Sequence, residues 1–160
     1  MAFLALNVNF LWAQSKISQR DWKPLIGNWQ GNLTYLDYSS GKPYTIPANI
    51  QIKFSDDAKE LIISNNYPNE PKANSVDTLK ISGNGTMINQ ETIISISNLK
   101  NGSKEIITEY KGKDGNDNKA AIIRHTYTFD NSNYSNRKDV QFIDQKTWIK
   151  RHEYKYSRNK

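Results

Sequence analysis

The sequence predicts an all-β domain of antiparallel strands, and three observations carry this prediction. Beyond Asp21, clusters of Gly, Pro, Asn, Asp, Ser and Lys interrupt the chain about every 8 to 14 residues. Between these clusters, segments 44–54 and 121–129 alternate apolar and polar residues with the period of 2 that is typical of a half-buried strand. No amphipathic helical stripe of useful length occurs. Hairpin-linked strands of this kind form either a sandwich or an up-and-down barrel.

Length and composition indicate one domain. A chain of 160 residues and 18.4 kDa buries about two thirds of its unfolded surface without metals or cross-links. Only 36% of the residues are hydrophobic, so each strand must concentrate its apolar side chains on one face. The chain has no cysteine, which excludes disulfides and cysteine-based metal or redox chemistry.

The N-terminal segment, residues 1–15, has the features of a signal peptide. It carries no charge before Lys16, is largely apolar from Ala2 to Ala13, and offers Ala13-Gln14 as a cleavage point. It lacks a basic start, and it is shorter than the roughly 20 apolar residues of a transmembrane helix. We therefore expect a secreted or periplasmic protein without an integral membrane span. The alternative is a first strand or helix packed on the domain.

The remaining elements follow one another without a domain boundary. Residues 16–24 suit a short helical lead-in, which Pro24 would end because proline breaks a helix interior. The β-domain then spans residues 25–157 and holds about 8 to 10 strands. Its first strand opens with "GNW" (27–29), and its last includes "WIKRHEY" (148–154).

The first strand indicates which side chains face the interior. Because successive strand residues point to opposite faces, one face carries Trp29, Gly31, Leu33, Tyr35 and Asp37. If Trp29 points inward, Gly31 removes bulk beside the indole or lets the strand bend. Leu33 and Tyr35 then line the middle of the interior, and Asp37 lies near the open rim.

The "GNW" motif resembles the G-x-W signature of lipocalins and the wider calycin group. This resemblance favours a single antiparallel up-and-down β-barrel over a sandwich. In lipocalins the tryptophan plugs the closed end of the barrel, and an arginine of the last strand packs over it. The resemblance therefore implies that Trp29 and Arg151 form a barrel-end pair and that the interior binds a small, largely apolar ligand.

A longer stretch, "LIGNWQG" (25–31), is similar to the opening of nitrobindin-type haem-binding barrels, L-x-G-x-W-x-G. In that family a histidine on a C-terminal strand holds the haem, which implies His152 in this chain. The family's further glycines are replaced here by residues such as Leu33 and Tyr35, so the flat approach that a porphyrin uses is missing. An inward histidine is also more often a hydrogen-bonded core residue than a ligand. We expect no cofactor, with haem as the alternative.

The segment 121–129 adds further candidates to the same interior. His125 lies between Ile123 and Tyr127 on the face that we expect to point inward. A histidine and a tyrosine inside a cavity can orient the polar head of a ligand. The candidate ligand-binding residues are Leu33, Tyr35, Asp37, Ile123, His125, Tyr127 and Tyr154.

The net charge of +6 comes largely from residues 146–160. A basic rim of this kind favours an anionic, lipid-like ligand. Interleaved with Trp148, Tyr154 and Tyr156, the same cations have the composition of a nucleic-acid platform. Solvated lysines on the outer face of a last strand explain the charge more simply, so we expect a small-molecule partner and no nucleic acid.

Catalytic residue sets are not evident. The sequence offers no nucleophile with an adjacent base, no convincing carboxylate pair and no metal-ligand spacing. We therefore expect a monomeric binding protein with no catalytic residues and no metal site. One alternative is a barrel filled by its own side chains that acts as an envelope, interaction or inhibitor module. Another is a haem-binding barrel or a barrel enzyme.

Overall fold

The structure is a computed structural model that describes residues 16–37 and 39–158. The predicted signal peptide, residues 1–15, lies outside the described residues. The elements are η1 (Gln19–Leu25), β1 (Gly27–Leu36), β2 (Pro43–Phe54), β3 (Glu60–Asn66), η2 (Pro71–Ala73), β4 (Ser75–Lys80), β5 (Met87–Ile88), β6 (Glu91–Asn98), β7 (Lys104–Asp114), β8 (Lys119–Phe129), β9 (Asn133–Phe142) and β10 (Ile149–Ser157), where η1 and η2 are 3-10 helices.

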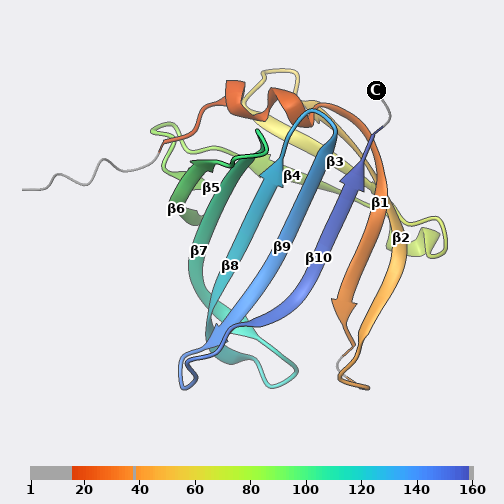
Figure 1. The fold of residues 1–160 in the computed structure, drawn as a ribbon, viewed down its shortest axis with the longest axis vertical. Helices are drawn as coiled ribbons and strands as arrows, with labels where there is room; N and C mark the ends of the chain where they lie inside the picture. The colour runs from red at the N-terminus through yellow and green to blue at the C-terminus, as the bar shows by residue number, and fades with distance from the viewer. Residues whose placement is uncertain (1–15, 38, 159–160) are drawn as a thin grey trace, which may run out of the picture.

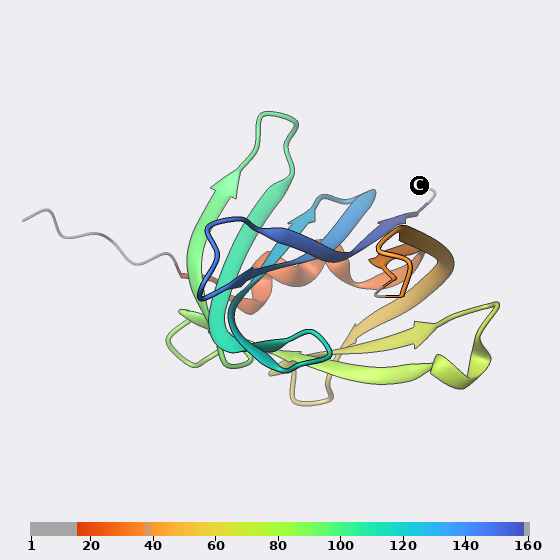
Figure 2. The ribbon, with the colours of Figure 1, turned by 90° about the horizontal axis from the view of Figure 1, so that it is seen from below.

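The strands form one antiparallel sheet that curls into a nearly closed barrel (Figure 1). Their order is β4-β3-β2-β1-β10-β9-β8-β7-β6-β5, so the first long strand pairs with the last. Beside the β4–β5 turn, Ile81 and Ile88 form a bridge, and the Asn89 amide donates to the Lys80 carbonyl at 2.6 Å. In Figure 2 the strands surround a central space, and η1 lies across its far end. The predicted all-β barrel with a short N-terminal helical segment is confirmed.

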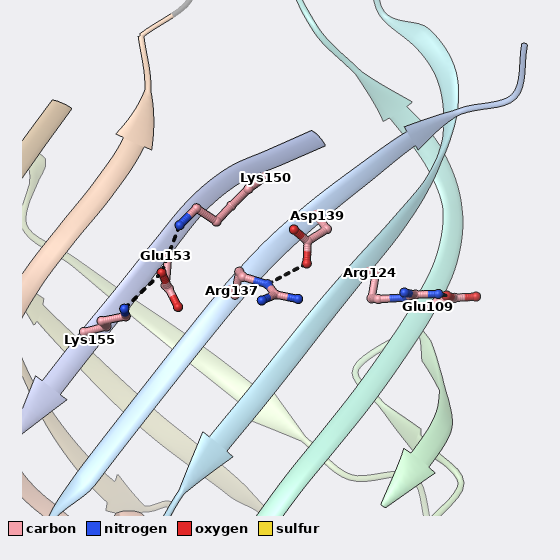
Figure 3. Close-up of polar contacts among 7 residues, drawn as sticks. All are labelled: Glu109, Arg124, Arg137, Asp139, Lys150, Glu153 and Lys155. Atoms are coloured by element: carbon pink, nitrogen blue, oxygen red, sulfur yellow. Dashed lines mark hydrogen bonds and ion pairs between the residues drawn. The ribbon is translucent and has the colours of Figure 1, made fainter. Parts of the chain in front are cut away.

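A row of alternating charges crosses the outer face of β7 to β10 (Figure 3). Glu109, Arg124, Asp139 and Lys150 are successive cross-strand partners. The Arg124 Nε donates to a Glu109 carboxylate oxygen at 2.7 Å. Opposite charges on neighbouring strands favour this register, although each exposed pair contributes no more than about 1 kcal/mol.

The last strand, β10, places its cations and its aromatic rings on opposite faces. The ammonium groups of Lys150 and Lys155 lie 3.1 and 3.4 Å from the Glu153 carboxylate on the outside. Tyr154 and Tyr156 point into the barrel, where their rings stack with centroids 5.8 Å apart. A single-strand nucleic-acid platform needs cations and rings on one surface. β10 does not provide such a surface.

The apolar core fills the end of the barrel that η1 covers. Trp22 of η1 is fully buried, and its ring stacks on Phe129 with a centroid separation of 5.4 Å. Trp29 of β1 is also buried, and its indole N–H donates to the Leu25 carbonyl at 2.7 Å. The buried hydrogen bond ties the helix to the first strand, and the two indoles close this end.

The arginine that covers Trp29 is Arg158, and the expected partner Arg151 is wrong. The Arg158 guanidinium lies 4.1 Å from the centre of the Trp29 ring and donates to the Ile26 carbonyl at 2.6 Å. Arg151 instead donates to Asp114 at 2.6 Å, near the opposite end of the barrel. The reason is antiparallel pairing. The start of β1 meets the end of β10, and seven strand residues separate the two arginines by about 23 Å.

Gly31 allows β10 to approach β1 closely. A Cβ atom at this position would lie 2.0 Å from the Lys155 carbonyl oxygen and 2.7 Å from the ring of Tyr156. Any side chain would therefore push β10 away. The sequence predicted that Gly31 removes bulk beside the indole of Trp29 or lets the strand bend. The structure shows that the space beside Gly31 is used by Lys155 and Tyr156.

Candidate functional site: the barrel interior

The inward side chains of the barrel lie in layers, because residues in register on neighbouring strands stand side by side. One layer is composed almost entirely of polar and ionisable residues. We call it the polar layer, and it runs through successive cross-strand partners from β7 to β2: Thr108, His125, Lys138, His152, Tyr35 and Tyr44.

A mixed layer lies next to the polar layer on the side toward η1. It consists of the successive partners Ile106, Tyr127, Asn136, Tyr154, Leu33 and Ile46. Successive layers are two residues apart along each strand, or about 6.6 Å. The polarity of the interior therefore rises from the mixed layer to the polar layer.

Most of the sequence-predicted ligand residues meet in these two layers. Leu33 and Tyr154 are direct partners in the mixed layer, which also contains Tyr127. Tyr35 and His125 belong to the polar layer. The structure therefore brings together residues that are up to 121 positions apart in the sequence (Leu33 to Tyr154).

The remaining two candidates lie nearer the open end. Ile123 is buried and pairs with Tyr110 and Val140, one layer beyond the polar layer. Asp37 lies in the turn after β1, where its carboxylate accepts hydrogen bonds from the Ser39 amide at 2.9 Å and the Ser40 hydroxyl at 2.7 Å. These bonds lower the pKa of Asp37 and hold its side chain in the turn.

A carboxylate orients His125 inside the barrel. The Glu91 carboxylate lies 2.9 Å from the His125 Nδ1 and also accepts a hydrogen bond from the Thr108 hydroxyl. This contact fixes the orientation of the imidazole ring. The ring of Tyr110 stacks on the imidazole at 6.4 Å. Sequence reasoning missed Glu91.

A buried ion triad lies on the open side of the polar layer. The Asp114 carboxylate accepts from Lys138 Nζ at 2.9 Å and from Arg151 Nε at 2.6 Å. Burial raises the pKa of the Asp114 carboxyl, but the hydrogen bonds and charges of Lys138 and Arg151 outweigh it and hold this pKa below its ordinary value. The interior cations therefore have an ionised partner at neutral pH.

His152 is the second histidine of the polar layer. Burial, together with the charges of His125 and Lys138, lowers the pKa of His152 to about 4. Its imidazole is therefore neutral at neutral pH. Its ring packs edge-on against Tyr154, with centroids 5.5 Å apart. Among the residues that the structure describes, neither ring nitrogen of His152 has a hydrogen-bond partner.

Two hollows lie beside these groups. The mouth cavity, of about 500 Å³, lies at the open end and is lined by Tyr35, Lys138, Arg151 and His152 with parts of the rim. The inner cavity, of about 170 Å³, lies deeper and is lined mainly by residues of β3, β4, β9 and β10. A wider hollow of about 840 Å³ lies outside the barrel beside η1, away from the polar layer.

Tyrosine side chains form one wall of the inner cavity. Tyr134, Tyr156 and Tyr154 stack in sequence, with centroid separations of 5.6 and 5.8 Å. The Tyr154 hydroxyl lies 3.0 Å from the hydroxyl of Tyr67, which follows β3. Burial raises the pKa of all three stacked tyrosines above the ordinary value of 10, so their hydroxyls stay protonated and can donate.

One buried polar atom at the inner cavity, the Oδ1 of Asn136, lacks a protein partner within the described part of the chain. The hydroxyl-bearing side chains of Tyr127, Tyr134 and Tyr156 line the same cavity. Buried polar atoms are usually satisfied by protein, water or a ligand. The inner cavity therefore presents an unsatisfied acceptor, beside tyrosine hydroxyls, to whatever fills it.

The comparisons with known proteins show similarity at the level of the fold. Rv2717c from M. tuberculosis, a solved crystal structure, is similar with a TM-score of 0.52 and 12% identity, covering 91% of this chain and 100% of that chain. A protein with unknown function of the DUF3598 family from Nostoc punctiforme PCC 73102 has a TM-score of 0.42 and 12% identity, covering 90% of this chain and 50% of that one. No family model and no curated protein matches the sequence.

No helix in residues 16–37 or 39–158 is both long enough and apolar enough to cross a membrane.

Proposed function

We propose that this barrel binds a small, largely apolar ligand in its interior. The observation that carries the proposal is the buried, unpartnered Oδ1 of Asn136 at the inner cavity, whose wall also carries the hydroxyls of Tyr127, Tyr134 and Tyr156. A barrel filled for stability alone would bury apolar groups there, because each buried unsatisfied polar group costs about 1–3 kcal/mol. A ligand with an apolar body and one or two polar atoms would satisfy these groups. The lipocalin-like G-x-W motif supports the same role.

The mouth cavity supports entry from the open end. Lys138 and Arg151 line it, but both are bonded to Asp114, so the mouth has less free positive charge than the sequence indicates. An anionic, lipid-like ligand would meet these two cations first. The proposal of interior binding holds for a ligand of either charge.

Displacement of an apolar fluorophore tests interior binding, with native mass spectrometry of the purified protein as a second readout. We expect fluorophore binding that lipids or retinoids displace. Tyr35→Trp should lower the capacity, because the larger ring fills the polar layer. Val76→Trp is the matched control, since Val76 is 67% exposed and its neighbour Asp77 lines the cavity from the opposite face of β4. Absence of a bound mass and of displacement across the panel would favour a filled interaction module.

His152 supports haem as a second candidate. Its neutral imidazole faces the mouth cavity, and Lys138 and Arg151 in the same cavity suit the carboxylates of a haem. His152 would hold the iron, and the haem would supply the redox or gas-binding chemistry. Titration with haemin should then shift the Soret band in the wild type and not in His152→Ala. Identical spectra for the two proteins would contradict this candidate.

We also propose that the protein is exported to the periplasm or the medium. The uncharged, apolar segment 1–15 supports this proposal. N-terminal sequencing of protein from its native host should find a mature chain that begins near Gln14. A cytosolic protein that retains Met1 would contradict it.

A further inference from the structure

The inner cavity is lined by hydrogen-bond acceptors and by no cationic side chain of the described chain. Its polar lining consists of four tyrosines, three asparagines, Thr78 and Asp77. The two cations of the interior, Lys138 and Arg151, line the mouth cavity instead and are bonded to Asp114. The two cavities therefore differ in charge.

Asp77, an exposed residue of β4, places a negative charge at the edge of the inner cavity. It lies on β4 opposite Ile63, and its carboxylate accepts a hydrogen bond from the Asn65 side-chain amide at 2.7 Å. No lysine or arginine in residues 16–37 or 39–158 forms an ion pair with it. The charge of Asp77 acts on the tyrosines of the cavity wall, since it is one of the groups that raise the pKa of Tyr154. A cation in the cavity would be the missing partner.

The unpartnered Asn136 Oδ1 also favours a ligand that donates hydrogen bonds. A carbonyl oxygen can only accept a hydrogen bond, so its partner must be a donor. Tyr154 of the mixed layer is the direct cross-strand neighbour of Asn136. The aromatic rings of this wall also attract cations, because the face of an aromatic ring carries partial negative charge.

We infer that the inner cavity binds a small organic cation, a protonated amine on a compact apolar or aromatic body. The inference rests on the proposed interior binding and names the class of ligand. The N–H groups of the amine would donate to Asn136 Oδ1 and a tyrosine oxygen, and its charge would pair with Asp77. The volume of about 170 Å³ suits a body of about the size of benzene.

A carboxylate fits this cavity less well. It would lie beside Asp77, and it would leave Asn136 Oδ1 without a donor. Only the tyrosine hydroxyls and asparagine amides would donate to it. Like charges at short range disfavour binding. A neutral alcohol could use the same hydrogen bonds as the amine but would gain nothing from the charge of Asp77.

Three probes of nearly equal size separate these cases: benzylammonium, benzyl alcohol and benzoate. Calorimetry at pH 7 should give the highest affinity for benzylammonium, about tenfold or more above benzyl alcohol, because a hydrogen bond to a charged group contributes about 1.5–3 kcal/mol. Benzoate should bind most weakly. Equal affinities for the ammonium and the alcohol, or a preference for benzoate, would overturn the inference.

Two matched variants test whether Asp77 causes the preference for benzylammonium. Asp77→Asn keeps the side-chain shape and should lower the affinity for benzylammonium about tenfold while leaving benzyl alcohol unchanged. Asp56→Asn removes the same charge from the exposed turn after β2 and should change neither affinity. If Asp77→Asn leaves benzylammonium binding intact, the cation site is refuted. Interior binding itself survives that result when benzyl alcohol still binds, and fails only when neither these probes nor the fluorophore bind.

Discussion

The closed end of the barrel interior and the layers nearer its mouth differ in polarity. The end beneath η1 is packed with apolar side chains. There the Trp29 indole N–H is bonded to the Leu25 carbonyl and its ring is covered by Arg158, whereas the buried Trp22 indole N–H has no partner among the described residues. The polar layer, about four residues further along β10 from Tyr156 to His152, holds a neutral buried histidine. The mixed layer between them buries an unpartnered amide oxygen at Asn136.

This difference separates stability from function. Packed apolar groups with satisfied hydrogen bonds stabilise a fold, whereas desolvated and unpaired polar groups lower its stability. The closed end therefore supplies the free energy of folding. The mixed and polar layers use part of that free energy to hold groups in place for a ligand. Substitutions at the closed end should consequently lower the stability of the protein. Substitutions in the mixed and polar layers should instead lower its affinity for a ligand.

The largest expected effect is loss of the closed end. Trp29→Ala removes a fully buried indole and should lower the free energy of unfolding by about 3–5 kcal/mol, because the surrounding strands cannot collapse into the cavity. Urea denaturation measures this change. A loss below about 1 kcal/mol would mean that Trp29 does not close the barrel.

The next effect is the dependence of stability on pH that His152 causes. The pKa of His152 is about 4 in the folded protein and about 6.5 in the unfolded chain. Above pH 6.5 the residue is neutral in both states and has no effect. Between pH 6.5 and 4 only the unfolded state binds the proton, so stability should fall as pH falls, by up to about 3 kcal/mol.

His152→Gln serves as the reference for this pH series. Its side chain does not titrate, so the free energy of unfolding should fall less between pH 6.5 and 4.5 than it does in the wild type. Carboxylates such as Asp114, whose pKa is lowered in the fold, lose their contribution mainly below this window. Parallel curves for the two proteins would show that His152 is accessible to protons in the fold.

The smallest effect is the coupling between Trp29 and Arg158. A double-mutant cycle with Trp29→Leu and Arg158→Ala should give a coupling free energy of about 0.5–2 kcal/mol. Arg151→Ala is the control, since Arg151 lies near the other end of the barrel, and it should be additive with Trp29→Leu within about 0.5 kcal/mol. Additivity at Arg158, or coupling at Arg151, would contradict the closed-end geometry.

Much of the fold was predictable because it rests on local patterns. Turn residues and the period of 2 predicted the strands, and alternation from Trp29 correctly placed Leu33 and Tyr35 inside. The partner of Trp29 was not predictable from composition, because Arg151 and Arg158 both lie in or next to the last strand. Only the antiparallel register of β1 with β10 distinguishes them.

The polar interior could not be predicted from the sequence. Glu91 and Asn136 lie on strands whose two faces both carry polar residues, so alternation alone does not say which face points inward. Asp114 resembles an ordinary turn residue, because "DGNDN" (114–118) reads as a hairpin turn. Its role depends on Lys138 and Arg151, which lie 24 and 37 positions away.

The most direct test of the central claim, that the inner cavity is kept polar for a ligand at a cost in stability, is the unfolding of Asn136→Leu. Leucine is close in shape to asparagine and has no polar atom to leave unsatisfied. Without ligand, urea denaturation should show this variant to be more stable than the wild type by about 1 kcal/mol, and calorimetry should show weaker binding of the benzyl probes. A variant that is less stable than the wild type and binds the probes equally well would contradict the claim.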